Sequence, residues 1–291
     1  MVPRFVCPQP SAAWTFIRLP PVATSVVVVD SVPKQYHKSI MSTSSSYSDK
    51  ERVLALYHQQ TVEELFDDYA DTFDEHLQNG LRYNVPTLMH SAWVKHAASQ
   101  QEGQRVNGKA NTSPSVQKCL DLGCGTGLAG QVFRDHCVYL QGVDLSMGMC
   151  QVAKSKRIYD LVVHDSLLSH MRKLDAGSFD LVMAADVFMY VLDLQAVLAQ
   201  VARILTSNGW FVFSTESMLD TEEGNVLRRE SERFAHKRNH VLDIAANVSS
   251  NQEAATTTPV LVSVQSVELR MEEGKPVLGD IYVFQKQPRP F

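Results

Sequence analysis

The spacing of apolar positions differs between the first and second parts of the chain. In residues 49–77 apolar side chains recur at three- and four-residue spacings, which predicts helix. Thr61 with Glu64 has the form of a capping box, so a helix is expected to restart there. A second helix is predicted over residues 86–98, with proline in its first turn. Residues 99–115 lack periodicity and are predicted to form a solvent-exposed loop.

Beyond residue 115, short apolar runs alternate with amphipathic stretches. The expected strands are 116–122, 137–145, 159–165, 179–187, 209–216, 259–271 and 276–286, and the expected helices are 128–136, 146–156, 194–205 and 228–248. Ser146 is the expected cap of the second of these helices. Such alternation predicts right-handed strand–helix–strand units and a mostly parallel sheet with helices on both faces. The last two strands follow each other without a helix, so at least one should be antiparallel. In such sheets ligands bind at the carboxyl ends of the strands.

Residues 1–48 differ in composition from the rest of the chain. They contain one acidic residue, Asp30, together with recurring prolines and a serine-rich stretch. This composition is typical of organelle transit peptides, although a disordered leader, or an extension before a start at Met41, has the same features. We therefore expect a leader or transit segment at 1–48 and one domain at 49–291, made of a helical cap (49–98) and a core (116–291). The expected compartment is the cytoplasm or, with a transit peptide, a mitochondrion or plastid.

Charge and cysteine usage narrow the possible functions. The 291 residues carry a formal net charge of -5 without a long basic run, so general affinity for nucleic acid is not expected. No apolar run reaches the roughly 18 to 20 residues of a membrane span. The five cysteines form no C-x-x-C pair, which fits a reducing compartment and neither a disulfide framework nor a zinc site. The histidines show no metal-binding spacing either, so no metal is expected.

The glycine-rich stretch CLDLGCGTGLAG carries the clearest chemical signal. It contains the G-x-G-x-x-G spacing of a dinucleotide-binding loop at Gly125, Gly127 and Gly130. Asp144 lies 19 residues after Gly125, where a ribose-binding carboxylate is wanted. However, Asp121 stands two residues before the first glycine of the turn, Gly123. A carboxylate there would repel a pyrophosphate, which a helix N-terminus otherwise attracts, and would suit a cation. S-adenosylmethionine carries an ammonium and a sulfonium but no phosphate, so it is favoured over NAD.

Residues 121–127 (DLGCGTG) resemble the first motif of class I S-adenosylmethionine-dependent methyltransferases. The resemblance continues in GVDLS (142–146), in Asp165 and in FDLVMAADVFMYV (179–191), and it covers roughly residues 49–286. More narrowly, YADTFDEHL, YDLVVHDSL, ERFAHKRNHV and LRMEEGKPVLGDIYVF resemble predicted methyltransferases that often occur beside tetratricopeptide repeats. No repeat of about 34 residues is found in the sequence itself. The resemblance implies an α/β fold: a Rossmann-like, mostly parallel seven-stranded sheet with an antiparallel last strand and an N-terminal helical cap.

The resemblance also implies roles for residues that follow the strands. Asp144 would bind the ribose hydroxyls, and Leu145 would pack on the adenine face. Asp165 and the N–H of Ser166 would bind the adenine edge. The expected cofactor-binding residues are Asp121, Gly123, Cys124, Gly125, Thr126, Gly127, Asp144, Leu145, Asp165, Ser166 and Asp186. Other roles stay open: capping for the carboxylates, core packing for Leu145, and contact with the acceptor for Asp186.

Three further residues are candidates for the acceptor side. Tyr69 lies one turn from Phe73 on the leading helix, which related enzymes place over the cofactor as a lid. Glu216 ends the fifth strand, and His236 is expected on the following helix, so both would face the same space. Tyr69, Glu216 and His236 are therefore the expected catalytic residues, with core or surface positions as the alternative for each.

Together these features predict transfer of a methyl group from S-adenosylmethionine to an unidentified acceptor, a small molecule. Positioning of donor and acceptor supplies much of such catalysis, because the leaving thioether needs no protonation. Two other functions stay open at this point. One is a non-catalytic S-adenosylmethionine-binding or protein-interaction module, and the other is an NAD-dependent oxidoreductase. Acceptor-dependent formation of S-adenosylhomocysteine distinguishes a methyltransferase from the binding module, and thermal shifts with S-adenosylmethionine and NAD distinguish it from the oxidoreductase.

Overall fold

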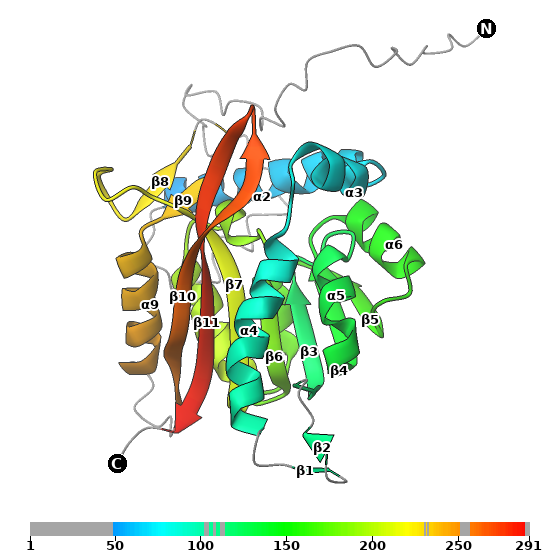
Figure 1. Cartoon of the computed structure of the whole chain (residues 1–291). Coiled ribbons are helices and arrows are strands. Elements are labelled where there is room, and N and C mark those ends of the chain that lie inside the picture. Colours follow the sequence, from blue (N-terminus) through cyan, green and yellow to red (C-terminus); the bar gives the residue numbers. More distant parts are fainter. Residues whose placement is uncertain are drawn as a thin grey trace, which may run out of the picture.

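A central sheet organises the described part of the chain (Figure 1). The computed structural model describes residues 49–101, 105–106, 109–110, 114–229, 231, 233–250 and 257–288, so the prediction for residues 1–48 lies outside it. The main strands are β3 (Val116–Leu122), β4 (Cys137–Asp144), β5 (Leu161–His164), β6 (Phe179–Ala184), β7 (Leu205–Ser217), β10 (Thr257–Glu272) and β11 (Lys275–Pro288). Their order across the sheet is β10-β11-β7-β6-β3-β4-β5.

The directions of the strands confirm the predicted α/β fold. β5, β4, β3, β6 and β7 pair in parallel, each with its neighbour. β11 is antiparallel to both β7 and β10. The parallel strands lie side by side because helical crossovers return the chain to the same end of the sheet each time. All their carboxyl ends therefore meet at one edge, where β3 has β4 on one side and β6 on the other.

A short pair of strands replaces the first part of the helix predicted over 228–248. β8 (Val226–Arg228) pairs with β9 (Phe234–His236), and the helix α9 begins only at Arg238 and ends at Ser250. The pairing of β6 with β7 ends at Phe213, which leaves the last residues of β7 without a neighbour on that side. β9 pairs in parallel with Glu216 and Ser217 there. The prediction of a helix at His236 was wrong because tertiary pairing along β7 decides the local structure.

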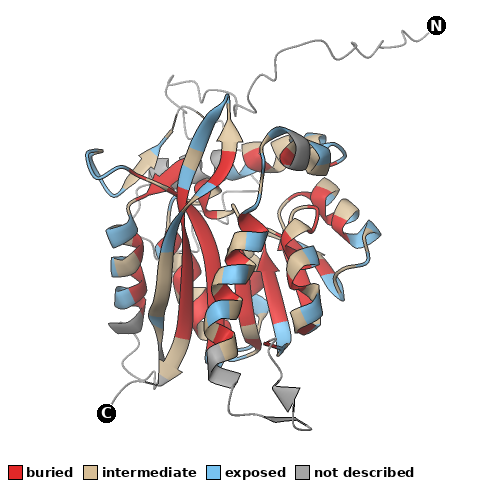
Figure 2. Cartoon of the chain, in the orientation of Figure 1, coloured by how far each residue is buried: buried red, intermediate tan, exposed pale blue. Residues whose placement is uncertain are grey.

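Helices cover both faces of the sheet (Figure 1), and its central strands consist largely of buried residues (Figure 2). One face is covered by α4 (Val85–Gln101) and α5 (Leu128–Phe133), with the 3₁₀ turn η4 (Arg134–His136). The other is covered by α7 (Leu167–Lys173), α8 (Leu194–Ile204) and α9. α6 (Met147–Ser155) packs beside β4 and β5, and the side chain of Ser146 caps it as predicted. Within the described ranges, no helix combines the length and apolarity that a membrane crossing needs.

Several predicted boundaries differ from the structure. α2 (Asp49–Tyr69) runs through Thr61 without a break, so no helix restarts there. α4 packs on the face of the sheet through Val85, Met89 and Trp93, so only the segment before it covers the strand ends. The polar stretch after β5 forms α7, which the sequence pattern did not reveal. The expected loop at 99–115 contains the short strands β1 (Arg105–Val106) and β2 (Lys109–Ala110).

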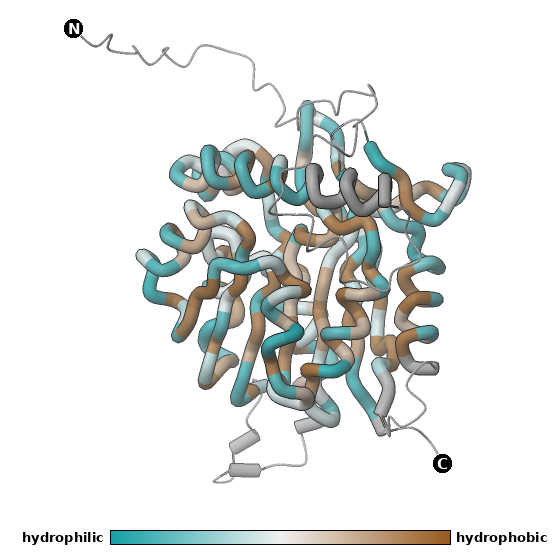
Figure 3. The backbone as a smooth tube through the Cα atoms, turned by 180° about the vertical axis from the view of Figure 1, so that it is seen from behind, coloured by the Kyte–Doolittle hydropathy of each residue, from teal (hydrophilic) through white to brown (hydrophobic). Residues whose placement is uncertain are grey.

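The cap proper consists of α2, the short helix α3 (Phe73–Glu75) and the π-helical turn η3 (His76–Gly80). It lies across the end of the sheet at which the parallel strands finish (Figure 1). Seen from behind, the apolar strands lie in the interior and the cap crosses above them (Figure 3). The carboxyl ends of the strands are therefore covered, and any ligand bound there is partly shielded from water.

Cys119 and Cys137 form a disulfide bond, so the expectation that the cysteines stay unpaired was wrong. Cys119 lies in β3 and Cys137 begins β4, and pairing of the two strands brings their Cα atoms to 6.0 Å. This separation is within the range that a disulfide requires. A separation of 18 residues in the sequence carries no signal of the bond, because strand pairing creates the proximity. Cys124 and Cys150 are buried free thiols.

Candidate functional site

The glycine loop between β3 and α5 forms the floor of the candidate site. Gly123, Gly125 and Gly127 have φ angles of 64°, 51° and 98°, a region that other residues rarely adopt. A Cβ atom on Gly123 would lie 2.6 Å from the side chain of Val187. A Cβ atom on Gly125 would meet no heavy atom within 4 Å. The loop therefore turns tightly against the protein at Gly123 and leaves open space above Gly125.

Asp121 lies directly below this loop and is fully buried. Its Oδ2 accepts a hydrogen bond of 2.6 Å from the hydroxyl of Tyr159. Its Oδ1 is buried and has no hydrogen-bond partner among the described residues. Burial raises the pKa of Asp121 to about 7, and the hydrogen bond from Tyr159 opposes this rise. The site thus contains one carboxylate oxygen that lacks a donor.

Tyr159 is a site residue that the sequence pattern did not identify. Besides its bond to Asp121, its ring lies against the backbone of the glycine loop and of β4. A Cβ atom on Gly130 would lie 2.3 Å from its hydroxyl oxygen, and one on Gly142 would lie 3.1 Å from its ring. The ring of Tyr159 therefore leaves no room for a side chain at either glycine position. Only the fold brings residue 159 beneath residue 130, so a local pattern could not reveal it.

Asp144 ends β4 and binds the backbone of the glycine loop. Its Oδ2 accepts from the N–H of Gly125 at 2.8 Å, and its Oδ1 accepts from the N–H of Ser146 at 2.9 Å. Burial raises its pKa, while these backbone bonds oppose the rise. Each carboxylate oxygen keeps a second lone pair, so hydroxyl groups of a ligand can still bind. The carbonyl oxygen of Leu145, which is half-buried, lies 2.8 Å from Nε2 of His164.

Asp165 and Ser166 follow β5 and already bind each other. The N–H of Ser166 donates to Oδ1 of Asp165 at 2.8 Å. Lys173 donates to Oδ2 of Asp165 at 2.6 Å. Burial opposes ionisation of Asp165, but its hydrogen bonds to Lys173 and Ser169 prevail and lower its pKa. The hydroxyl of Ser166 caps α7 by accepting from Ser169. An adenine edge would therefore have to share these two groups with their present partners.

Two aspartates tie the cap to this half of the site. Asp67 of α2 accepts from the hydroxyl of Ser146 at 2.6 Å and from the N–H of Gly148 at 2.9 Å. Asp74 of α3 accepts from the hydroxyl of Thr126 and from the ammonium group of Lys156. Thr126 is buried by this contact. The cap is thus fixed to the glycine loop and to the start of α6.

Cys124 lies in the glycine loop, and Tyr69 lies in the cap that covers it. The N–H of Cys124 donates to the carbonyl of Val143 at 3.0 Å, and burial raises the pKa of its thiol. Tyr69, at the end of α2, packs edge-on against Phe73 and His76, each with a ring-centroid distance of 5.4 Å. Its hydroxyl is buried without a hydrogen-bond partner among the described residues. The hydroxyl of Tyr69 is therefore a candidate ligand contact.

Asp186 follows β6 and begins the other half of the site. Its φ angle of 55° is uncommon for a residue with a side chain, and such conformations cluster at functional sites. Its N–H donates to the hydroxyl oxygen of Ser214, which donates in turn to Oδ1 of Asp186 at 3.0 Å. Its Oδ2 forms an ion pair of 3.0 Å with Arg270. Burial raises the pKa of Asp186, although the charge of Arg270 opposes this rise.

Arg270 of β10 links Asp186 to two further carboxylates. Its Nη2 binds Oε1 of Glu216, and its Nε binds Oε1 of Glu272 at 2.6 Å. Arg233 binds Oε2 of Glu272 at 2.5 Å, and its Nε lies 3.1 Å from Oε1 of Glu216. These five side chains are hereafter called the ion cluster. The sequence identified Asp186 and Glu216 but not their arginine partners.

His236 does not lie next to the carboxylate of Glu216 in the way predicted from a helix. It is fully buried in β9, and its Nε2 lies 3.2 Å from the carbonyl oxygen of Phe188. Burial lowers its pKa to about 4, so the imidazole is neutral near pH 7. Its contact instead anchors the 3₁₀ turn η5 (Phe188–Tyr190), which follows Asp186. Among the described residues, no three His, Cys, Asp or Glu side chains are arranged so that they could hold a metal ion.

The arrangement is a Rossmann-like fold similar to that of methyltransferases, and residues 120–213 match the methyltransferase domain family. Over 122 residues the chain is 31% identical to malonyl-[acyl-carrier protein] O-methyltransferase of Serratia marcescens, covering 41% of this chain and 46% of that protein. Over 107 residues it is 32% identical to ubiquinone biosynthesis O-methyltransferase of Thiobacillus denitrificans, covering 34% of this chain and 44% of that protein. The chain thus spans less than half the length of these two relatives.

A solved structure supports the same fold over more of the chain. It is that of 1,6-didemethyltoxoflavin-N1-methyltransferase from Burkholderia thailandensis with bound 1,6-didemethyltoxoflavin and S-adenosylhomocysteine. The two share 14% identity and a TM-score of 0.56, over 84% of this chain and 93% of that chain. At this level of identity the likeness concerns the fold and leaves the acceptor open.

Proposed function

We propose that this protein transfers a methyl group from S-adenosylmethionine to a small-molecule acceptor. The observation that carries the proposal is the position of Asp144, whose carboxylate binds the glycine loop at Gly125 while keeping lone pairs for two ribose hydroxyls. The match to the methyltransferase domain family supports the same reaction. S-adenosylmethionine carries a methyl group on a sulfonium. An acceptor attacks this methyl carbon in line and displaces the neutral thioether.

The residues of the cofactor half fit this molecule better than NAD. The open space above Gly125 admits a ligand close to the backbone. The unpartnered Oδ1 of Asp121 suits an ammonium group and would repel a pyrophosphate. Asp165 and Ser166 would bind the adenine edge, and Leu145 its face. We retain Gly123, Cys124, Thr126 and Gly127 as loop contacts through their backbone.

The acceptor would lie between the cap and the ends of β6 and β7. Asp186 and Glu216 are the carboxylates of the ion cluster at these strand ends, and Tyr69 approaches from the cap. We keep Tyr69 and Glu216 as proposed catalytic residues. His236 is proposed to act indirectly, because its imidazole binds the carbonyl of Phe188 and so holds the turn after Asp186. The named relatives methylate oxygen or nitrogen, so the comparisons leave the target atom open.

Calorimetry with the Asp144→Ala variant tests the cofactor assignment. Loss of two charged hydrogen bonds should weaken binding of S-adenosylmethionine by about 3 kcal/mol, more than a hundredfold. Asp135→Ala is the matched control, because Asp135 is exposed at the opposite end of β4. Unchanged affinity in a folded Asp144→Ala protein, or binding of NAD by the unaltered chain, would contradict the proposal. Acceptor-dependent formation of S-adenosylhomocysteine then distinguishes an enzyme from a binding module.

The narrower resemblance, to predicted methyltransferases found beside tetratricopeptide repeats, is also a proposal. It rests on four stretches of sequence, two of which contain residues of the ion cluster: ERFAHKRNHV contains Arg233, and LRMEEGKPVLGDIYVF contains Arg270 and Glu272. If this resemblance is correct, the cluster belongs to what distinguishes that group. The domain division at residue 49 likewise stays a proposal, to be tested by the melting temperature of a chain that begins at Ser48.

A further inference from the structure

The ion cluster has one more negative than positive group. Three carboxylates (Asp186, Glu216, Glu272) surround two guanidinium groups (Arg233, Arg270). Exposed fractions of the side chains run from 3% for Arg270 to 15% for Glu272, so water solvates the cluster poorly. Within the described residues, the ion pairs of these five side chains are all with one another. A buried excess charge is unfavourable unless a counter-charge arrives or a carboxyl group takes up a proton, and burial raises the pKa of Asp186.

The guanidinium groups are poorly placed to receive an anion. Arg270 uses its Nε, Nη1 and Nη2 on the three carboxylates of the cluster, and its side chain is 3% exposed. Arg233 already binds Glu272 and lies beside Glu216. An incoming anion would bring a fourth negative charge against two positive ones. An incoming cation would instead neutralise the excess.

A series of aromatic side chains in mutual contact, here called the aromatic wall, runs from the cap to the turn after Asp186. Tyr190, four residues after Asp186, packs edge-on against Phe66 of the cap at a centroid distance of 5.3 Å. Phe66 contacts Phe73, which contacts Tyr69 in turn. Burial raises the pKa of Tyr190, while the charges of Arg233 and Arg270 lower it, so this ring lies within the electrostatic reach of the ion cluster. Aromatic rings beside excess negative charge suit an organic cation.

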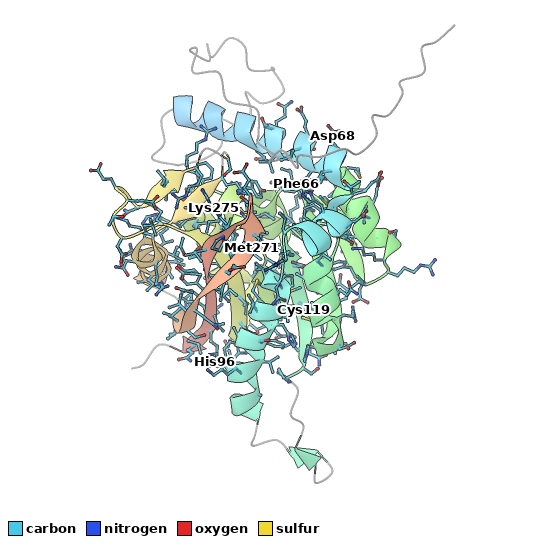
Figure 4. The ribbon with its side chains drawn as sticks, turned by 45° about the horizontal axis from the view of Figure 1, so that its top comes forward. Phe66, Asp68, His96, Cys119, Met271 and Lys275 are labelled. Carbon is cyan, nitrogen blue, oxygen red and sulfur yellow. A yellow bond between two sulfur atoms is a disulfide. The ribbon has the colours of Figure 1, made fainter. Side chains whose placement is uncertain are left out.

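The strand that carries Arg270 is also tied to the segment beneath the cap. The N–H of Met271 donates to the carbonyl of Leu81 at 2.8 Å. Viewed from the cap end, Phe66 on α2 and Met271 in β10 lie at this same end of the molecule (Figure 4). Tyr83, two residues after Leu81, lies within the electrostatic reach of Asp186, Arg270 and Asp121. The ion cluster, the aromatic wall and the cofactor half therefore adjoin one another.

We propose, on the basis of the proposed function, that the methyl acceptor is an amine with an apolar body and that the ion cluster recognises its ammonium form. Asp186 takes the proton, because it contacts one guanidinium group whereas Glu216 contacts two. The neutral nitrogen then forms a bond to the methyl carbon as the carbon–sulfur bond breaks, and the electron pair of that bond stays on sulfur. The products are a methylated ammonium and a neutral thioether, so charge and atoms balance.

Methyl transfer into fractionated metabolites tests the acceptor class. The full chain is incubated with S-adenosylmethionine labelled in its methyl group and with a cell extract separated by ion exchange into cationic, anionic and uncharged fractions. We expect at least tenfold more label in the cationic fraction than in either of the others. Label mainly in the anionic or uncharged fraction would overturn the inference while leaving the proposed function intact. Failure to bind S-adenosylmethionine in calorimetry would instead overturn the proposed function.

A binding measurement tests the same inference without turnover. The protein is saturated with S-adenosylhomocysteine and titrated with 2-phenylethylammonium, 3-phenylpropionate or 2-phenylethanol, which share an apolar body. The ammonium should bind at least tenfold more tightly than the other two, and Asp186→Asn or Glu216→Gln should remove this preference. Glu223→Gln is the control, because Glu223 is exposed after β7 and outside the cluster. Equal binding of the three probes, or a preference for the carboxylate, would refute the inference.

Discussion

The two halves of the sheet edge are built by different means. In the cofactor half, at the ends of β3, β4 and β5, a backbone loop meets carboxylates that follow nearby strands; Gly125 and Asp144 are 19 residues apart. In the ion cluster, side chains from distant segments meet, and Asp186 and Arg270 are 84 residues apart. The spacing of glycines in the sequence predicts a backbone loop, whereas no local pattern predicts which distant side chains will form a cluster. The cofactor is therefore easier to infer than the acceptor.

The largest expected effect is a loss of stability when an arginine of the ion cluster is replaced. Arg270→Met leaves three buried carboxylates facing one remaining arginine, and removal of one partner of a buried ion pair costs about 3–5 kcal/mol. Urea unfolding should show this loss in the free energy of unfolding. Arg172→Met, at an exposed position on α7, should change it by no more than about 0.5 kcal/mol. A loss below about 1 kcal/mol in Arg270→Met would mean that the cluster is open to water.

A smaller effect is expected at Gly130 in the cofactor half, where replacement by alanine tests whether the stability rises or falls. In most helices Gly→Ala stabilises by about 0.5–1 kcal/mol. At Gly130 in α5 the new methyl group would lie 2.3 Å from the hydroxyl oxygen of Tyr159. Gly130→Ala should therefore destabilise the protein by about 1–3 kcal/mol, as overpacked cores do. Thermal melting decides the sign, and a stabilised variant would show that Tyr159 does not pack beneath the loop.

The smallest expected effect is a several-fold change in cofactor affinity with pH. Asp121 has a pKa of about 7 in the folded protein against 3.8 as its ordinary value, so the folded state binds its proton more tightly. The stabilisation from this group should be full below pH 3.8 and lost as the pH rises towards 7. Binding of an ammonium group needs the ionised carboxylate, so cofactor affinity should rise several-fold between about pH 6 and 8.

Tyr159→Phe sharpens this test. The hydroxyl of Tyr159 binds the ionised form of Asp121, so its removal should raise the pKa of Asp121 further and move the affinity profile to higher pH. Tyr139→Phe is the matched control, because that hydroxyl lies 3.4 Å from Gln141 and away from Asp121. Titration calorimetry across the pH range measures both profiles. Identical profiles in Tyr159→Phe and the unaltered chain would show that Tyr159 does not set the pKa of Asp121.

The predictions that held depend on short-range patterns. The five parallel strands and the cap of Ser146 on α6 follow from apolar runs and from a serine directly before a helix. The position of Asp144 beside Gly125 follows from the meeting of the carboxyl ends of parallel strands at one edge. Each of these requires only residues close in sequence, or strands whose order the alternation already restricts.

The predictions that failed each involve a partner that the sequence does not identify. His236 lies in a strand because the pairing of β6 with β7 ends at Phe213, and the last residues of β7 pair with β9 instead. Cys119 and Cys137 are joined because adjacent strands place them at 6.0 Å. α7 was missed because its polar residues hide the few that are buried, His170 and Met171.

By itself, the sequence determined the fold class, the glycine loop and the carboxylates of the cofactor half, because periodicity and turn chemistry are local. Only the tertiary structure decided the rest. It placed Tyr159 under Asp121, set two arginines among three carboxylates, and laid an aromatic wall from the cap beside them. These contacts join segments tens of residues apart, and the burial that shifts their pKa values and leaves an excess charge exists only once the sheet and its cap have assembled.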